Sequence, residues 1–194
     1  FCHRDAGGAG SPLERMRLKR VILAVASGAI LAVAGVSAAQ TSGAHFTKNG
    51  FPACTDVGTQ LTCTAEVAGL GNETVLAVVN ASGTATGVFC LAPGSGNPSP
   101  GQNPAVDVDT SGSQEITNIK NGRARVNVST ADPTVTPEDA GCQNNNWGVL
   151  VSDVEFTDYT LTISQGGVTL FTCTGSFSPA STDGQTSTPT CTSA

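Results

Sequence analysis

Hydrophobic and polar residues alternate with a period of two along much of the chain beyond residue 60. In 61–67, leucine, cysteine, alanine and valine alternate with threonine and glutamate, and 105–110 and 123–129 alternate in the same way. This period places the apolar side chains on one face of a half-buried β-strand. Residues 74–80 are nearly all apolar, so we expect a central strand there.

Turn residues separate these segments at short intervals. Ser82-Gly83, Asn121-Gly122 and Gly166-Gly167 predict tight turns, because glycine and asparagine tolerate the backbone angles that such turns need. Two longer segments, 92–104 and 130–146, are rich in glycine, proline and asparagine and predict loops. Further strands are expected at 84–91, 116–119, 149–156, 159–164 and 168–174.

Eight or nine short strands without a convincing helix after residue 40 predict an all-β protein. We expect an antiparallel, immunoglobulin-like β-sandwich over residues 54–177, with a small β-barrel as the alternative. Residues 40–53 are polar and predict a flexible lead-in. Residues 178–194 are rich in serine, threonine and proline and predict a loose tail, except where Cys191 holds it.

The segment 16–39 has the pattern of a secretory signal peptide. Met16 is followed by basic residues, then by a charge-free apolar run at 21–36, and then by small residues that place the cut after Ala38 or Ala39. A permanent membrane anchor is the alternative, but the run is shorter than the roughly 20 residues that span a bilayer. Residues 1–15 show no hydrophobic period, and we interpret them as upstream translation.

The expected mature chain is strongly acidic. From residue 40 onward it has four basic and thirteen acidic residues, a net charge of −9, whereas the whole chain has −6. Such a surface repels phosphate backbones, which argues against nucleic-acid binding. After cleavage no second apolar span remains, so we expect a released, extracellular protein without membrane attachment.

Six cysteines remain after cleavage, and an even number behind a signal peptide predicts disulfides. Six cysteines allow 15 pairings. Our working assignment joins the two nearest in sequence, then two distant segments, and then the tail: Cys54 with Cys63, Cys90 with Cys142, and Cys173 with Cys191. A zinc site is the weaker alternative, because there is no C-x-x-C motif and His45 is the only histidine of the mature chain.

The chain resembles a group of small secreted bacterial proteins of uncharacterised function over roughly residues 54–175. The resembling strings are LTCTAEVAGLGNETV (61–75), PGQNP (100–104), IKNGRARVNVST (119–130) and GCQNNNWGVLVSDVEFTDYTLTISQGGV (141–168). The resemblance implies a bacterial, secreted, β-rich protein. It implies no activity and transfers no catalytic residue.

Hydrolysis by paired carboxylates is the enzymatic alternative, since nucleophilic catalysis with histidine would rest on His45 in the lead-in. Residues two apart on a strand share a face, which pairs Asp107 with Asp109 and Asp153 with Glu155; Asp158 is a further candidate. The simpler interpretation is an acidic solvent-facing surface, and we predict no catalytic residue.

Two binding sites are also candidates. Asp132, Glu138 and Asp139 offer carboxylate oxygens for calcium, although the spacing of a calcium loop is missing. Trp147 could stack on a sugar ring beside the amides of Asn144, Asn145 and Asn146; the alternative is a core tryptophan packed on a disulfide. We therefore predict a non-enzymatic extracellular protein without a cofactor, either a binding module or a self-associating surface or matrix component.

Overall fold

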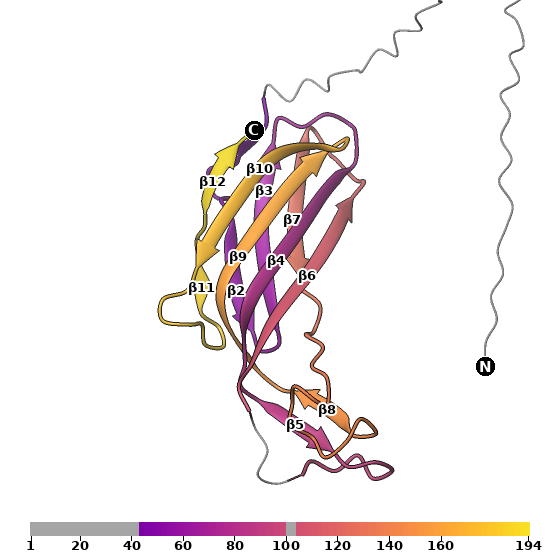
Figure 1. Ribbon diagram of the computed structural model, residues 1–194. Helices are drawn as coiled ribbons and strands as arrows, with labels where there is room; N and C mark the ends of the chain where they lie inside the picture. The colour runs from indigo at the N-terminus through magenta and orange to yellow at the C-terminus, as the bar shows by residue number, and fades with distance from the viewer. Residues whose placement is uncertain (1–42, 100–103) are drawn as a thin grey trace, which may run out of the picture. The chain divides into compact units, whose positions relative to one another are not determined.

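The computed structural model describes residues 43–99 and 104–194, which form two face-to-face antiparallel sheets and a small two-stranded ribbon (Figure 1). The predicted upstream segment and signal peptide lie outside the described residues. Within these residues, no helix has the length and apolar character required to cross a membrane.

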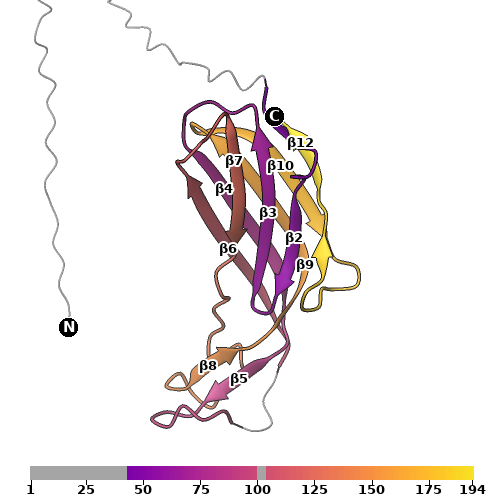
Figure 2. The ribbon, with the colours of Figure 1, turned by 180° about the vertical axis from the view of Figure 1, so that it is seen from behind.

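Sheet A is built around strand β3, which pairs with β7 on one side and with β1 and β2 on the other (Figure 2). Strand β11 extends the sheet beyond β2. The bounds are β1 His45–Phe46, β2 Ala53–Val57, β3 Gln60–Ala68, β7 Arg123–Ser129 and β11 Thr186–Ser187.

Sheet B has the order β12-β10-β9-β4-β6, and the separate ribbon pairs β5 with β8. The bounds in sheet B are β4 Val75–Ala85, β6 Val106–Ile116, β9 Val154–Gln165, β10 Val168–Ser176 and β12 Thr190–Ser193. The ribbon consists of β5 Val88–Leu91 and β8 Gly148–Val151.

The connections between the sheets are immunoglobulin-like. The β2–β3 hairpin lies in sheet A, β4 and β6 pair in sheet B, β7 returns to sheet A, and the β9–β10 hairpin closes sheet B. The inward residues of both sheets form the core, with Leu61, Phe156, Leu161 and Ile163 among the largest fully buried side chains. The predicted β-sandwich is confirmed.

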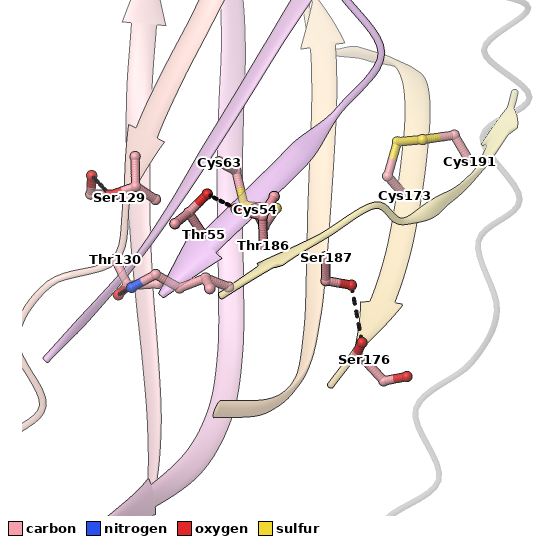
Figure 3. The surroundings of a disulfide bond; sticks show 12 residues. Cys54, Thr55, Cys63, Ser129, Thr130, Cys173, Ser176, Thr186, Ser187 and Cys191 are labelled. Carbon is pink, nitrogen blue, oxygen red and sulfur yellow. Dashed lines mark hydrogen bonds between the residues drawn. A yellow bond between two sulfur atoms is a disulfide. The ribbon is translucent and has the colours of Figure 1, made fainter. Parts of the chain in front are cut away.

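All three assigned disulfides are present: Cys54–Cys63, Cys90–Cys142 and Cys173–Cys191. The first and third join directly opposed residues on neighbouring strands, β2 with β3 and β10 with β12 (Figure 3). Antibody domains instead place their disulfide between the two sheets. Here each of these two bonds fastens a shorter strand to a longer one within the same sheet.

Two strands are longer than the sequence predicts. Ser82-Gly83 lies inside β4 instead of ending it, and Gly112 lies inside β6. In both places a neighbouring backbone comes so close that a Cβ atom would collide with it, at Glu155 for Gly83 and at Ser129 for Gly112. A glycine within a strand commonly marks such a close approach, so these glycines are packing residues and not turns.

The ends of the domain are more ordered than predicted. The expected lead-in contributes β1, whose Phe46 ring lies 4.3 Å from that of Phe171. The expected tail contributes β11 and β12, and thereby passes from the edge of sheet A to the edge of sheet B. The predicted tight turns at Asn121-Gly122 and Gly166-Gly167 are confirmed, with positive φ at all four residues.

Candidate functional site

A groove of about 830 Å³ lies across the outer face of sheet B, and we call it the outer-face groove. Strands β4, β6, β9 and β10 contribute its side chains, and residues 131–134 form a wall beside β6. Its polar lining includes Asn80, Ser82, Asp109, Ser111, Asp132, Asp158, Thr160 and Thr174.

A β-bulge shapes the floor of the outer-face groove. The register between β4 and β9 shifts between Ser82 and Gly83, so that Thr157 is the extra residue of β9. Its hydroxyl donates a hydrogen bond to the Ser82 carbonyl at 3.3 Å. A bulge bends its strand and increases the local twist, which accounts for a hollow at this point of the sheet.

The wall of the groove is fixed to β6 by two hydrogen bonds. The Ala131 N–H donates to the carbonyl of Ser111 at 2.9 Å, and the Thr110 hydroxyl donates to the carbonyl of Ala131 at 2.5 Å. These contacts hold the chain along the otherwise free edge of β6. The groove therefore lies on hydrogen-bonded strands and one secured segment, which favours a preformed site.

Two carboxylates flank Ser82 in the groove. Ser82 lies opposite Asp109 on β6 and opposite Asp158 on β9, so the two aspartates are two strand spacings apart, about 10 Å. The Ser82 hydroxyl donates to Asp109 at 2.6 Å. Among the described residues, no hydrogen bond or ion pair engages the Asp158 carboxylate, which leaves it available to a ligand.

Asp132 is a third carboxylate in the groove lining and is already engaged. It accepts hydrogen bonds from the Thr59 hydroxyl at 2.6 Å and the Gln60 amide at 3.0 Å. These two bonds lower the pKa of Asp132 below its ordinary value, the Thr59 bond having the larger effect. Asp132 is therefore ionised at neutral pH and adds negative charge to a lining that contains no basic residue among those described.

Threonines continue the polar surface from the groove toward β12. Three strands place pairs of threonines in register on this outer face, and Leu161 and Cys173 point inward between the first two pairs. The pairs are Thr160 and Thr162, Thr172 and Thr174, and Thr190 and Thr192. The face thus combines hydroxyls with the amide and carboxylates of the groove.

The carboxylates that the sequence offered for hydrolysis lie at several places on sheet B and next to it. Asp107 and Asp109 share the outer face of β6, as the alternation predicted, and bond to Thr84 and Ser82. Asp153 precedes β9, 3.5 Å from the Thr86 hydroxyl, while Glu155 lies opposite Thr84. Only Asp109 and Asp158 of this set line the groove.

The predicted calcium ligands are not brought together. Asp139 accepts a hydrogen bond from the Thr136 hydroxyl at 2.5 Å within its own turn, whereas Asp132 bonds to Thr59 and Gln60. Glu138 is exposed in the same turn as Asp139. The described residues contain no group of three or more acidic, histidine or cysteine side chains that could hold a metal ion.

The predicted sugar platform lies at the ribbon. Trp147 directly precedes β8; it is half-buried and packs against the core cluster that includes Cys90. Asn144, Asn145 and Asn146 are exposed, and the carbonyl and side chain of Asn144 accept bonds from the next turn residues. Because part of the Trp147 side chain packs against the core, less of its ring is free to stack on a sugar than in a fully exposed tryptophan. Its role in binding stays a prediction.

Sequence reasoning missed Asn80 and Ser82, which lie at the centre of the groove. Their outward positions on β4 alternate with buried Ala77, Val79 and Ala81, and this alternation was the available signal. No family model matches the chain, and no curated protein matches it either.

Proposed function

We propose that the chain is an exported, extracellular binding module that takes a hydroxyl-rich ligand, such as a saccharide, into the outer-face groove. The observation that carries the proposal is the mixed polar lining of that groove: an amide, hydroxyls and carboxylates on adjacent strands. Hydroxyl groups of a ligand can both donate to carboxylates and accept from amides and hydroxyls, so this combination suits them.

A metal or a small cation fits the groove less well than a saccharide. Asp109 is bonded to Ser82, Asp132 is bonded to Thr59 and Gln60, and the groove spreads its carboxylates over several strands. Cation sites need oxygens that converge on one point, whereas an extended ligand can meet separated partners one after another.

The proposal includes export of the protein from the cell. The signal-peptide pattern at 16–39 supports it, as does the resemblance to secreted bacterial proteins. Three disulfides agree with it, because such bonds persist in oxidising compartments. We interpret the disulfide-fastened sandwich as a scaffold that keeps the groove formed outside the cell.

The test is a binding assay with soluble polysaccharides by affinity electrophoresis, followed by calorimetry on the oligosaccharide that binds. Asn80→Ala should weaken binding by about fivefold and Asp158→Asn by about tenfold or more, since hydrogen bonds to charged groups are stronger. Ser113→Ala, on the same face of β6 but outside the groove lining, is the matched control. Equal affinities of all three variants and the parent would refute the proposal.

Hydrolysis is the second candidate, because Asp109 and Asp158 lie about 10 Å apart across one strand. This spacing of the two strand positions is slightly above the range of roughly 6.5–9.5 Å between the two carboxyl groups of inverting glycosidases. Release of reducing ends from the bound polysaccharide, abolished in Asp158→Asn, would identify a hydrolase. Binding that is reversible and leaves the saccharide intact would support the binding module.

A further inference from the structure

All four basic residues of the expected mature chain lie along one short stretch of β3. Arg125 and Arg123 on β7 oppose Glu66 and Ala68, and Lys120 is bridged to Arg123. On the other side, the turn that carries Lys48 is bonded to Glu66 through the Thr47 N–H and the Gly50 carbonyl. We call this the basic patch: Lys48, Lys120, Arg123 and Arg125.

The basic patch carries a local excess of positive charge in an acidic protein. Glu66 lies within it and is paired with Arg123 at 3.7 Å. Four cations around one carboxylate leave a net charge of +3, while residues 40–194 as a whole carry −9. Charge of one sign gathered at one place attracts ligands of the opposite sign locally, even where the total charge does not.

A second groove, of about 280 Å³, lies at this patch on sheet A. Its side-chain lining includes Phe51, Arg125, Asn127, Asn49 and Thr64, together with Glu66, whose carboxylate is paired with Arg123 outside the lining. Phe51 is 51 % exposed. Its ring meets that of Phe46 edge-on at 5.3 Å, and Phe46 in turn packs on the buried Phe171. Phe51 is thus fastened to the core while about half of its surface faces solvent.

Arg125 is the cation that this groove presents. Among the described residues, no ion pair or hydrogen bond engages its guanidinium, whereas Arg123 is paired with Glu66. A guanidinium binds a carboxylate or sulfate through two parallel hydrogen bonds. The groove therefore combines an aromatic surface, an unengaged guanidinium, and the amides and hydroxyl of Asn49, Asn127 and Thr64.

We propose that this sheet A groove binds an anionic saccharide. The acidic group pairs with Arg125, the ring stacks on Phe51, and ring hydroxyls bond to Asn127 and its neighbours. The site is separate from the outer-face groove, lies on the opposite sheet and does not depend on the function proposed there. Its ligand differs in class, because the lining of the outer-face groove has no basic residue, whereas this groove has Arg125, and its one carboxylate, Glu66, is paired with Arg123.

Two other anionic partners fit the patch less well. Duplex DNA carries one charge per about 1.7 Å and would meet the repulsion of the remaining acidic surface. A second copy of the chain could offer the acidic outer face of sheet B, where Asp107, Asp109 and Asp158 lie among hydroxyls. The exposed apolar side chain of that face, Leu76, lies opposite Glu115 at the other end of β4 from these aspartates, whereas a saccharide ring gives Phe51 an apolar partner next to the acidic group.

The experiment is calorimetry on the full disulfide-bonded domain with three polymers: polygalacturonate, which carries carboxylates, dextran sulfate, which carries sulfates, and neutral dextran. We expect binding of an acidic polymer that depends on Arg125, whereas any binding of dextran, which has no acidic group, should be the same in Arg125→Gln as in the parent. Arg125→Gln should weaken binding about tenfold or more, and Phe51→Ala about tenfold. Lys120→Gln removes the same charge outside the groove lining, at a residue without an ion pair among those described, and should weaken binding no more than about threefold.

The outcomes separate the alternatives. Binding of one acidic polymer alone supports the site and identifies the acidic group. Equal losses in Lys120→Gln and Arg125→Gln would mean unspecific attraction and would overturn the proposal, as would the absence of binding to both acidic polymers. Self-association in ultracentrifugation that is lost in Arg125→Gln, without polymer binding, would assign the patch to a second copy. The Asn80→Ala, Asp158→Asn double variant should bind acidic polymer normally, which keeps the two proposed sites distinguishable.

Discussion

Gly175 leaves the space that the ring of Tyr159 fills between β9 and β10. The two residues are directly opposed, and a Cβ atom on Gly175 would overlap Cζ of the tyrosine ring. Tyr159 is 3 % exposed, and its ring lies 5.7 Å from that of Phe177. The ring therefore has little room to move away.

We predict that Gly175→Ala destabilises the domain by about 1–3 kcal/mol, because overpacking forces side chains or backbone to shift. Urea unfolding followed by tryptophan fluorescence measures the change. Gly71→Ala is the matched control, since its Cβ would meet no atom closer than 3.7 Å. An unchanged midpoint in Gly175→Ala would show that the ring turns aside without cost.

Asp56 is the buried acid that holds the last loop against the sandwich. Its carboxylate accepts a hydrogen bond from Ser181 at 2.5 Å, and the Ser181 hydroxyl accepts one from the Phe156 N–H at 2.7 Å. The other carboxylate oxygen has no hydrogen bond among the described residues. Burial raises the pKa of Asp56 above its ordinary value of 3.8; Asp183 and Asp153 add to the rise, and the Ser181 bond opposes it.

This raised pKa predicts a stability that falls as the pH rises. Above the ordinary carboxyl pKa the unfolded chain has released the proton that the folded chain still holds, so the free energy of unfolding decreases until Asp56 ionises in the folded state. In Asp56→Asn this decrease is removed. We expect the stability of the variant relative to the parent to increase in urea unfolding as the pH rises above the ordinary carboxyl pKa of 3.8. A constant difference would contradict this prediction.

At the scale of elements, the β5–β8 ribbon depends on its disulfide more than the sheets do. A two-stranded ribbon is marginally stable on its own. Cys90 on β5 is joined to Cys142 across 52 residues of chain. Closing a loop of that length lowers the conformational entropy of the unfolded chain, which stabilises the folded state by about 4 kcal/mol.

We predict that Cys90→Ala, Cys142→Ala loosens the ribbon while the sandwich stays folded. Hydrogen exchange followed by mass spectrometry should show loss of protection in Val88–Leu91 and Gly148–Val151, with protection kept in β4 and β9. Cys54→Ala, Cys63→Ala is the control, because that bond joins β2 to β3 within sheet A. Ribbon amides that exchange as slowly as in the parent would contradict the prediction.

The element pattern was largely predictable because alternation reports directly on which side of a strand is buried. Where the prediction was wrong, the cause was tertiary: Gly83 and Gly112 resemble turn residues in sequence, and only the neighbouring backbones reveal their role. The candidate site was less predictable. Asp109 and Asp158 are 49 positions apart in sequence and lie on either side of Ser82. Their spacing therefore depends on the pairing register of three strands.

At the scale of the whole molecule, charge is divided between the two sheets. The outer face of β6 and β9 in sheet B carries Asp107, Asp109, Glu115, Glu155 and Asp158. The four basic residues gather at one stretch of sheet A, around Glu66. A division of this kind gives two faces with opposite preferences for ligands, although the total charge alone would suggest only repulsion of anions.

The predicted signal peptide and the three disulfides both lead us to expect export from the cell. The apolar run at 21–36 follows Arg17, Lys19 and Arg20, and small residues come after it, so we expect the export machinery to cut after Ala38 or Ala39. Intact mass spectrometry of the protein exported from a bacterial host should give a chain that starts at Ala39 or Gln40. Non-reduced peptide mapping should recover the three pairs Cys54–Cys63, Cys90–Cys142 and Cys173–Cys191. A product that begins at Met16 with free thiols would contradict export. The protein would then not encounter the two proposed extracellular ligands, even though the fold would still contain both grooves.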